Sequence, residues 1–478
     1  MPKPKLSPAS ANTPPGPAPA PRAPRGCLLV HNIGHLVTMD ASRRVLKGAW
    51  VLAEDGWIRA VGEGRAPRAD GAEILDARCG VVTPGMVNTH HHMFQNLARA
   101  FHPISNLPLL PWLAGHIPLW RRFTPDDLFV ATQVACVELM LSGCTLTSDH
   151  HYLFPRDGAG DLLDAGFHAA AALGIRYVGC RGSVNQPSDI MPEWSTQDLD
   201  VILADCDRLH GRFHDKRPGS MAQVAFAPCT VFGCSGEHYR ESARLARQLG
   251  ARLHTHCGET IPENHDAVER LGSRPLAYMA RHGWEGDDVW LAHGIHFTDA
   301  EVRRLGRARM GVAHCPVSNM RLGSGVCRVN DLRAAGATVS LGVDGSASND
   351  SGHLLNEARA ALLLTRVVHG AGAMTPEQAL ELATLGGARN LGREKDLGSI
   401  EPGKCADLAV FPSSDLFSNG AHDPVHGLVL CHARNVDALV VHGRVRVRDG
   451  HVLGVELGPL LERHRRTARR FHDGLKKG

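Results

Sequence analysis

Eight short apolar segments alternate with helical segments through the middle of this chain. Each is long enough for one β-strand, and the text between them carries helix signals, as in 124–143, which opens on a capping threonine and closes on a glycine. The eight segments are 85–90, 144–150, 175–181, 223–229, 251–256, 288–293, 310–315 and 338–344. Strands that alternate with helices build a parallel sheet, and eight of them close readily into a barrel. The sequence therefore predicts an α/β fold, a (β/α)₈ TIM-type barrel.

Both ends of the chain show short strands and turns without helices between them. Such β-rich text runs from 27 to 76 and returns at 406–411 and 437–450. We expect these strands to form one small β-sandwich domain beside the barrel. The expected division is a first small-domain part at 27–80, the barrel at 81–392, and a second small-domain part with a tail at 393–478.

The first 26 residues are dominated by Pro, Ala and Ser. They contain no apolar run of the signal-peptide kind. A segment of this composition has too few apolar side chains to offset the entropy cost of ordering. We therefore expect 1–26 to be a disordered tail.

Composition excludes several classes of partner. The net charge is only +3 with histidines neutral, and the basic side chains are spread along the chain, which argues against nucleic-acid binding. The apolar runs are too short to span a bilayer, which argues against a membrane protein. The thirteen cysteines form no CxxC pair, and an odd, scattered set is typical of free thiols in a reducing compartment. We expect a cytoplasmic protein.

Ionisable side chains gather at the ends of four of the predicted strands. They are His90 and His92 after the first strand, His256 at the fifth, His293 at the sixth and Asp344 at the eighth. In a barrel of this kind the carboxyl ends of the strands surround the active site. Four of these five residues together supply three imidazoles and one carboxylate, a set that suits Zn²⁺ or a similar divalent ion with an open position for water. The alternative for each histidine alone is a hydrogen-bonded core residue.

Strand alternation separates neighbouring histidines. His254 and His256 share one side of their strand, and His256 lies nearer the rim. We interpret His256 as the ligand and His254 as interior packing. By the same spacing His90 and His92 point together, and His91 faces elsewhere.

Several motifs resemble one known family in its own order. They are TPGMVNTHHH (83–92), LHTHCGET (253–260), WLAHGIHF (290–297), HCPVSNMRL (314–322) and LGVDGSASND (341–350). This text resembles the amidohydrolase superfamily and, within it, the ATZ/TRZ-type deaminases. The resemblance implies a metal-dependent hydrolase of C–N bonds other than peptide bonds, with His90, His92, His256 and Asp344 as metal ligands.

The resemblance also implies roles for three acid–base groups. Asp344 accepts a proton from the attacking water, His293 hydrogen-bonds the nucleophile, and Glu259 carries protons to a ring nitrogen and the departing amine. Two-metal members bridge their ions with a lysine at strand four. The segment at 223–233 has no lysine, and the nearest is Lys216, upstream. We expect one ion, Zn²⁺, with Fe²⁺ as the alternative.

Five segments carry a narrower resemblance: NTHHHMFQNLARA (88–100), LPLLPWL (107–113), SGCTLTSDHHYLFP (142–155), SNMRLGSGVC (318–327) and GVDGSASND (342–350). In them the chain is similar to the bacterial 8-oxoguanine deaminases, which convert 8-oxoguanine to urate and ammonia. That resemblance implies a small heterocyclic substrate contacted by Gln95, Arg181 and Trp112, although each could instead be a rim or packing residue. The alternatives are a deaminase of isoxanthopterin or of another pterin or triazine, and, in another class, a catalytically inactive structural barrel. A homo-oligomer is an open expectation.

Overall fold

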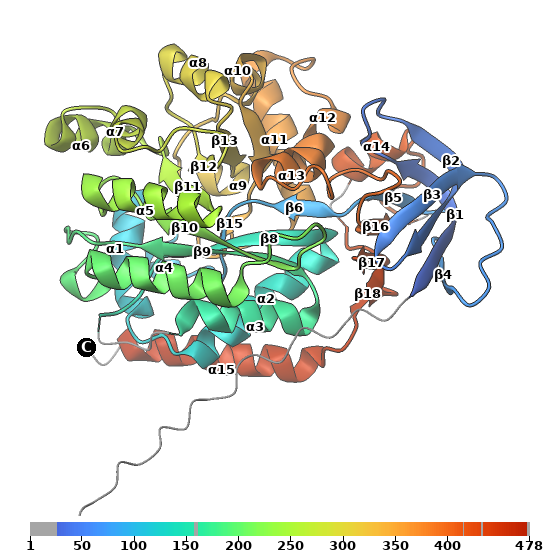
Figure 1. Cartoon of the computed structure of the whole chain (residues 1–478), viewed down its shortest axis with the longest axis horizontal. Helices are drawn as coiled ribbons and strands as arrows, with labels where there is room; N and C mark the ends of the chain where they lie inside the picture. Colours follow the sequence, from blue (N-terminus) through green and yellow to red (C-terminus); the bar gives the residue numbers. More distant parts are fainter. Residues whose placement is uncertain (1–25, 157–160, 414, 432–433, 476–478) are drawn as a thin grey trace, which may run out of the picture.

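The computed structural model describes residues 26–156, 161–413, 415–431 and 434–475 (Figure 1). The predicted tail therefore lies outside the described residues, except for Gly26. Two sheets organise the chain, one inside a ring of helices and one at the side of that ring.

Eight parallel strands form the barrel. In sheet order they are β14 (Thr338–Leu341), β13 (Gly311–His314), β12 (Val289–His293), β11 (Arg252–Cys257), β10 (Ala222–Pro228), β9 (Arg176–Ser183), β8 (Cys144–His151) and β6 (Met86–Asn88). The barrel closes between its first and last strands, where the Thr89 amide donates to the Leu341 carbonyl at 3.0 Å. Two short strands, β7 (His91–His92) and β15 (Asp344–Gly345), pair beside this contact. The predicted barrel is confirmed, and its strands begin within three residues of the predicted positions.

Helices surround the barrel (Figure 1). They are α1 (Leu109–Trp120), α2 (Pro125–Leu141), α3 (Leu162–Leu173), α4 (Leu199–Phe213), α5 (Gly236–Leu249), α6 (Ile261–Leu271), α7 (Pro275–Arg281), α8 (Asp299–Arg307), α9 (Pro316–Arg321), α10 (Val329–Ala335), α11 (Leu354–His369), α12 (Pro376–Glu381) and α13 (Gly387–Asn390). Shorter turns are η1 (Met93–Ala98), η2 (His102–Ile104), η3 (Glu193–Ser195) and η4 (Leu382–Gly386). Thr124 caps α2 as predicted, in a reciprocal capping box with Asp127.

The two chain ends share the second sheet. From the N-terminal end come β1 (Cys27–Val37), β2 (Val45–Glu54), β3 (Trp57–Glu63), β4 (Glu73–Asp76) and β5 (Val81–Pro84). From the C-terminal end come β16 (Leu408–Phe411), β17 (Ala438–Val441), β18 (Arg444–Arg448) and β19 (His451–Val452). Strands β5 and β16 pair antiparallel and join the two sets. One apolar core holds side chains from both sets, so the sheet curves around it.

A buried ion pair lies where the barrel meets this sheet. The Arg176 guanidinium at the start of β9 donates to both carboxylate oxygens of Asp407, each at 2.9 Å, and also to the carbonyls of Gly219 and Ser220. Asp407 additionally accepts from the His442 backbone amide at 2.8 Å. The two domains are therefore joined by charges whose hydrogen-bonding groups are satisfied.

The C-terminal stretch does more than complete the small sheet. The segment at 424–431 forms α14 (Pro424–His426) and η5 (Gly427–Cys431), which contact α11 and α12. The last helix, α15 (Leu457–Leu475), packs on α2 and η1 of the barrel. The exact domain boundaries stay a prediction. All thirteen cysteines lie in the described residues and are unpaired, and no described helix is long and apolar enough to cross a bilayer.

Candidate metal and active site

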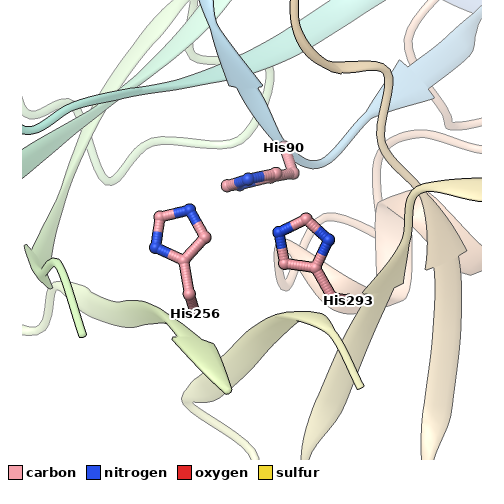
Figure 2. Close-up of side chains that lie close together, drawn as sticks. All are labelled: His90, His256 and His293. Atoms are coloured by element: carbon pink, nitrogen blue, oxygen red, sulfur yellow. The ribbon is translucent and has the colours of Figure 1, made fainter. Parts of the chain in front are cut away.

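The carboxyl ends of the barrel strands bring the five predicted ionisable residues to one mouth. His90 and His92 follow β6, His256 lies in β11, His293 ends β12, and Asp344 follows β14. Figure 2 shows the rings of His90, His256 and His293 directed toward a common space. All five side chains are buried. Parallel strands in register produce this convergence, because their last residues lie along one rim.

The donor atoms of these residues lie close together. His90 Nε2 and His92 Nε2 are 3.3 and 3.4 Å from the same oxygen, Asp344 Oδ1, and His92 Nε2 is 3.1 Å from His256 Nε2. His90 Nε2 has no hydrogen-bond partner among the described residues. A buried nitrogen without a partner costs free energy unless something binds it. A divalent metal ion fits this set of three imidazoles and one carboxylate.

Each candidate ligand is oriented through its other ring nitrogen. His92 Nδ1 lies 2.7 Å from the His150 carbonyl, and His256 Nδ1 lies 2.8 Å from the Cys229 carbonyl. A carbonyl can only accept, so these contacts fix Nδ1 as the protonated nitrogen and leave Nε2 with a free lone pair. Backbone carbonyls commonly hold metal-binding histidines in this way.

His254 has a larger part than the packing role that we predicted. It is fully buried, and its Nε2 lies 2.8 Å from His90 Nδ1. Its Nδ1 in turn lies 2.9 Å from the Trp290 carbonyl. The segment after β6 and strand β11 thus meet through one imidazole pair, in which His254 fixes the orientation of the His90 ring. The sequence could not show this, because alternation gives a side chain's face and not its partner.

Burial sets the protonation of the candidate ligands. It lowers the pKa of His90, His92 and His256, so these imidazoles are neutral near pH 7. Burial alone would raise the pKa of the Asp344 carboxyl, but the imidazoles around it hold that pKa well below its ordinary value. Neutral imidazole and ionised carboxylate are the forms that bind a metal ion.

Two residues of the mouth have left-handed backbone, which side chains other than glycine seldom adopt. The φ angle is 72° at His293 and 60° at Asp344. The Asp344 carboxylate is held there by hydroxyls of Ser318 at 2.5 Å and Ser348 at 3.1 Å, both on its second oxygen. Backbone strain of this kind is common at functional sites. Oδ1 is thereby left to face the histidines.

Glu259 and His293 form the other half of the mouth. Their closest atoms, Glu259 Oε2 and His293 Nε2, are 3.4 Å apart. Burial raises the pKa of Glu259 to about 7, and the carboxylates nearby raise the pKa of His293 although its burial opposes this. Glu263 holds the turn by accepting from the Glu259 amide at 2.7 Å, and Asn319 Oδ1 lies 3.0 Å from His293 Nδ1. A carboxyl with a pKa near 7 can give and take a proton at neutral pH.

These groups open onto one pocket with about 570 Å³ of empty volume, open space at its mouth included. Its wall includes Gln95 and Trp112, two of the residues predicted to contact substrate, together with Tyr152, Met191 and Phe232; substrate contact itself stays a prediction. Such a volume and a largely apolar wall suit a small, flat molecule.

The amide of Gln95 is presented to this pocket with one atom unsatisfied. Gln95 Nε2 lies 3.2 Å from the Tyr152 hydroxyl, and Gln95 Oε1 has no hydrogen-bond partner among the described residues. Gly345 makes room for it, since a Cβ at that position would come within 1.7 Å of Oε1. A buried acceptor without a partner beside a pocket can accept from a ligand.

Arg181, predicted to contact substrate, is not among the residues that line this pocket. It is buried, and its guanidinium donates to Asp205 at 2.6 Å, to Gln197 at 2.8 Å and to the Gly182 carbonyl. It also lies over the ring of Phe154, 3.6 Å from the centroid. Alternation placed Arg181 at the end of its strand but could not show that Asp205 would engage it.

The sequence interpretation missed a group of supporting side chains. They are His254, Glu263, Ser318, Asn319, Ser348 and Tyr152, while His150 contributes through its backbone carbonyl. Several of them lie inside the motifs that carried the resemblance, such as the Ser-Asn pair of HCPVSN. The sequence signal that could have identified them is the presence of polar side chains at or just after the ends of barrel strands.

Comparison with known proteins agrees with this geometry. Residues 81–446 match the amidohydrolase family. The chain is 47% identical over 422 residues to the 8-oxoguanine deaminase of Pseudomonas aeruginosa, an alignment that covers 87% of this chain and 94% of that protein. It is 36% identical over 430 residues to an isoxanthopterin deaminase of an unknown prokaryotic organism, covering 84% and 88%. Among solved structures, an atrazine chlorohydrolase of Arthrobacter aurescens complexed with zinc matches with a TM-score of 0.88 and 28% identity, covering 92% of this chain and all of that one.

Proposed function

Because the chain belongs to the amidohydrolase family, we propose that it is a metal-dependent aminohydrolase that converts 8-oxoguanine and water to urate and ammonia. The observation that carries this assignment is the 47% identity to an 8-oxoguanine deaminase over nearly the whole of that protein. The pocket supports it, because ionisable groups and a few other polar side chains line it together with apolar ones. The enzyme class is therefore hydrolysis of a C–N bond other than a peptide bond.

His90, His92, His256 and Asp344 would hold one divalent ion. Zn²⁺ suits three nitrogen donors and one oxygen donor, and a similar solved structure contains zinc; Fe²⁺ is the alternative. When bound, such an ion lowers the pKa of a coordinated water toward neutrality and polarises the substrate. A single ion is consistent with the position of Lys216, which precedes β10 and so belongs to the opposite end of that strand from the site.

The protein's own acid–base groups would divide the proton transfers among them. Asp344 takes a proton from the attacking water, and His293 donates a hydrogen bond to the oxygen as it bonds to the amine-bearing carbon. Glu259 gives its proton to the adjacent ring nitrogen, takes up the remaining hydroxyl proton as the carbonyl forms, and passes that proton to the amine, which leaves as ammonia. The proton held by Asp344 then restores Glu259 to its starting form. Amine loss needs this acid because an amide anion is a very poor leaving group. The pKa of Glu259, raised to about 7 by burial, is matched to that task.

Gln95 and Trp112 would orient the heterocycle. Gln95 lines the pocket, so its amide can hydrogen-bond the polar edge of the ring when its side chain turns toward the bound molecule. Trp112 supplies a flat apolar surface from α1. Recognition of a flat, polar-edged ring by one apolar wall and a few polar atoms is the usual design of such pockets.

A substrate panel tests this proposal. The metal-loaded enzyme is given 8-oxoguanine, guanine, isoxanthopterin and an alkylamino-triazine in turn, and ammonia or amine release is measured. We expect kcat/KM to be highest for 8-oxoguanine, by about tenfold or more over the next substrate. A preference for isoxanthopterin would replace the substrate and keep the reaction class. No release from any compound by fully metallated protein would favour an inactive structural barrel.

A further inference from the structure

The C-terminal helix α15 returns from the small sheet to the outside of the barrel (Figure 1). There it contacts η1, α1 and α2. Two of these elements form the pocket: η1 begins immediately after His92 and contains Gln95, and α1 carries Trp112. A helix far from the chemistry in sequence therefore lies directly behind the substrate side of the pocket.

The first contact is a hydrogen bond to the residue next to Gln95. His464 Nε2 lies 2.8 Å from Asn96 Oδ1. Burial lowers the pKa of His464 to about 4, so the ring is neutral and its Nε2–H is the donor. Asn96 is buried, and its Nδ2 donates to the Ala131 carbonyl of α2 at 2.7 Å. The amide of Asn96 is thus fixed from both sides, by α15 and by α2.

The second contact is a chain of aromatic rings. Phe471 of α15 packs on Phe123, with the centroids 5.1 Å apart, and Phe123 packs on Phe94 of η1 at 5.3 Å. Phe94 in turn packs edge-on against Tyr152, which lines the pocket and contacts Gln95. Side chains packed at this density transmit a shift at one end of the row to the other.

A third contact reaches the other pocket element. His472 of α15 lies 5.2 Å from Phe101, ring centroid to centroid. Phe101 lies 5.9 Å from His116, and the His116 ring lies tilted against Trp112 with the centroids 4.3 Å apart. Both segments that are expected to contact substrate are therefore backed by the same helix.

We propose that α15 is a positioning element for the substrate side of the pocket, and that His464 is its positioning residue, acting through Asn96 on η1. This inference rests on the proposed function, in which Gln95 and Trp112 contact the heterocycle. The hydrogen bonds and ring contacts described for α15 lead to η1, α2 and the segments beside them, and none of them reaches His256, His293 or Asp344. Loss of the hydrogen bond between His464 and Asn96 should therefore weaken substrate binding and leave the metal in place.

The test compares three variants of the full-length, metal-loaded enzyme. His464→Ala removes the donor to Asn96, and His464→Gln can restore one. Arg466→Ala is the control, because Arg466 is exposed on the same helix and pairs only with Glu462 among the described residues. The measurements are metal content, KM and kcat for 8-oxoguanine, and hydrogen exchange of the backbone amides at 93–101 without substrate.

For His464→Ala we expect KM to rise roughly fivefold with kcat within about twofold, and exchange at 93–101 to accelerate. His464→Gln should recover most of both effects, and Arg466→Ala should change neither. Unchanged KM and unchanged exchange in His464→Ala would overturn the proposal. So would a lower melting temperature with an unaltered KM, which indicates a purely structural role. If neither the wild-type enzyme nor any variant deaminates 8-oxoguanine, the proposed function fails. Hydrogen exchange at 93–101 in His464→Ala then still decides whether α15 stabilises that segment.

Discussion

Both ends of the barrel bury polar side chains, but the hydrogen bonding of these side chains differs between the two ends. At the junction with the small sheet, Arg176 and Asp407 are paired through two hydrogen bonds of 2.9 Å, with backbone groups meeting their remaining donors and acceptors. At the mouth, His90 Nε2 and Gln95 Oε1 are buried without a hydrogen-bond partner among the described residues. Burial of polar atoms is costly unless they are paired.

Backbone conformation differs less between the two ends. The mouth holds His293 and Asp344 in left-handed conformations, and His442, which donates its amide to Asp407 at the junction, is left-handed as well, whereas Arg176 lies in a regular strand, β9. The comparison teaches that one end of the barrel is built for stability and the other for binding. Substitutions at the mouth should therefore change metal content and turnover, and substitutions at the junction should change stability.

His256→Ala is expected to have the largest effect. It removes an imidazole whose Nε2 lies 3.1 Å from that of His92, so bound metal and turnover should fall together, with kcat down roughly 10³-fold or more. Metal analysis and ammonia release measure both. His265→Ala is the control, because His265 is an exposed histidine on the nearby helix α6. Full metal content with normal turnover would remove His256 from the ligand set.

Glu259→Gln should separate metal binding from proton transfer. The amide keeps the size of the carboxyl but cannot exchange a proton, so kcat should drop by roughly 10²-fold while metal content and substrate affinity stay near wild type. Glu269→Gln, an exposed position on α6, is the matched control. Turnover at a near wild-type rate would show that Glu259 only offsets the positive dipole at the start of α6.

The sequence predicted the barrel strands and the position of the mouth, but not the ion pair at the other end of the barrel. Apolar periodicity located all eight strands, and the residues at their ends located the mouth, since both follow from local pattern and the geometry of parallel strands. Strand β6 was the least accurate, with three of six predicted residues in regular pairing. There the chain leaves the ladder at Thr89 so that His90 and His92 can turn inward.

Long-range partners could not be predicted in the same way. His254 was placed on the correct face, yet its contact with His90 joins residues 164 positions apart. Arg181 was placed at the end of the correct strand, yet Asp205 on α4 engages it. The helix α15 follows the last small-sheet strand but packs on the barrel. Each outcome depends on which elements meet in space, which periodicity does not contain.

Arg176→Met tests the junction. It leaves the Asp407 carboxylate buried without its bidentate partner, which should destabilise the protein by about 3–5 kcal/mol. Turnover per metal-loaded folded molecule should change less than about twofold, because the pair lies at the end of β9 away from the mouth. Thermal melting and kcat measure the two effects. Arg304→Met is the control, since the Arg304–Glu285 pair is about one-third exposed and should cost under about 1 kcal/mol. A large loss of kcat in Arg176→Met would mean that the two ends of the barrel are coupled.

Arg181→Met should have the smallest effect and decides between two interpretations of this residue. Arg181 and Asp205 are paired at 2.6 Å, but Asp205 keeps a second partner, Arg208, at 2.8 Å, so less charge is left unpaired than at Asp407. The stability loss should therefore be about 1–3 kcal/mol, below that of Arg176→Met. Methionine can fill the space over Phe154, where the guanidinium now lies. If Arg181 does not touch substrate, KM for 8-oxoguanine should stay within about twofold of wild type. A direct hydrogen bond to the heterocycle would instead give a rise of roughly tenfold or more with unchanged metal content, and would require Arg181 to leave Asp205 when substrate binds.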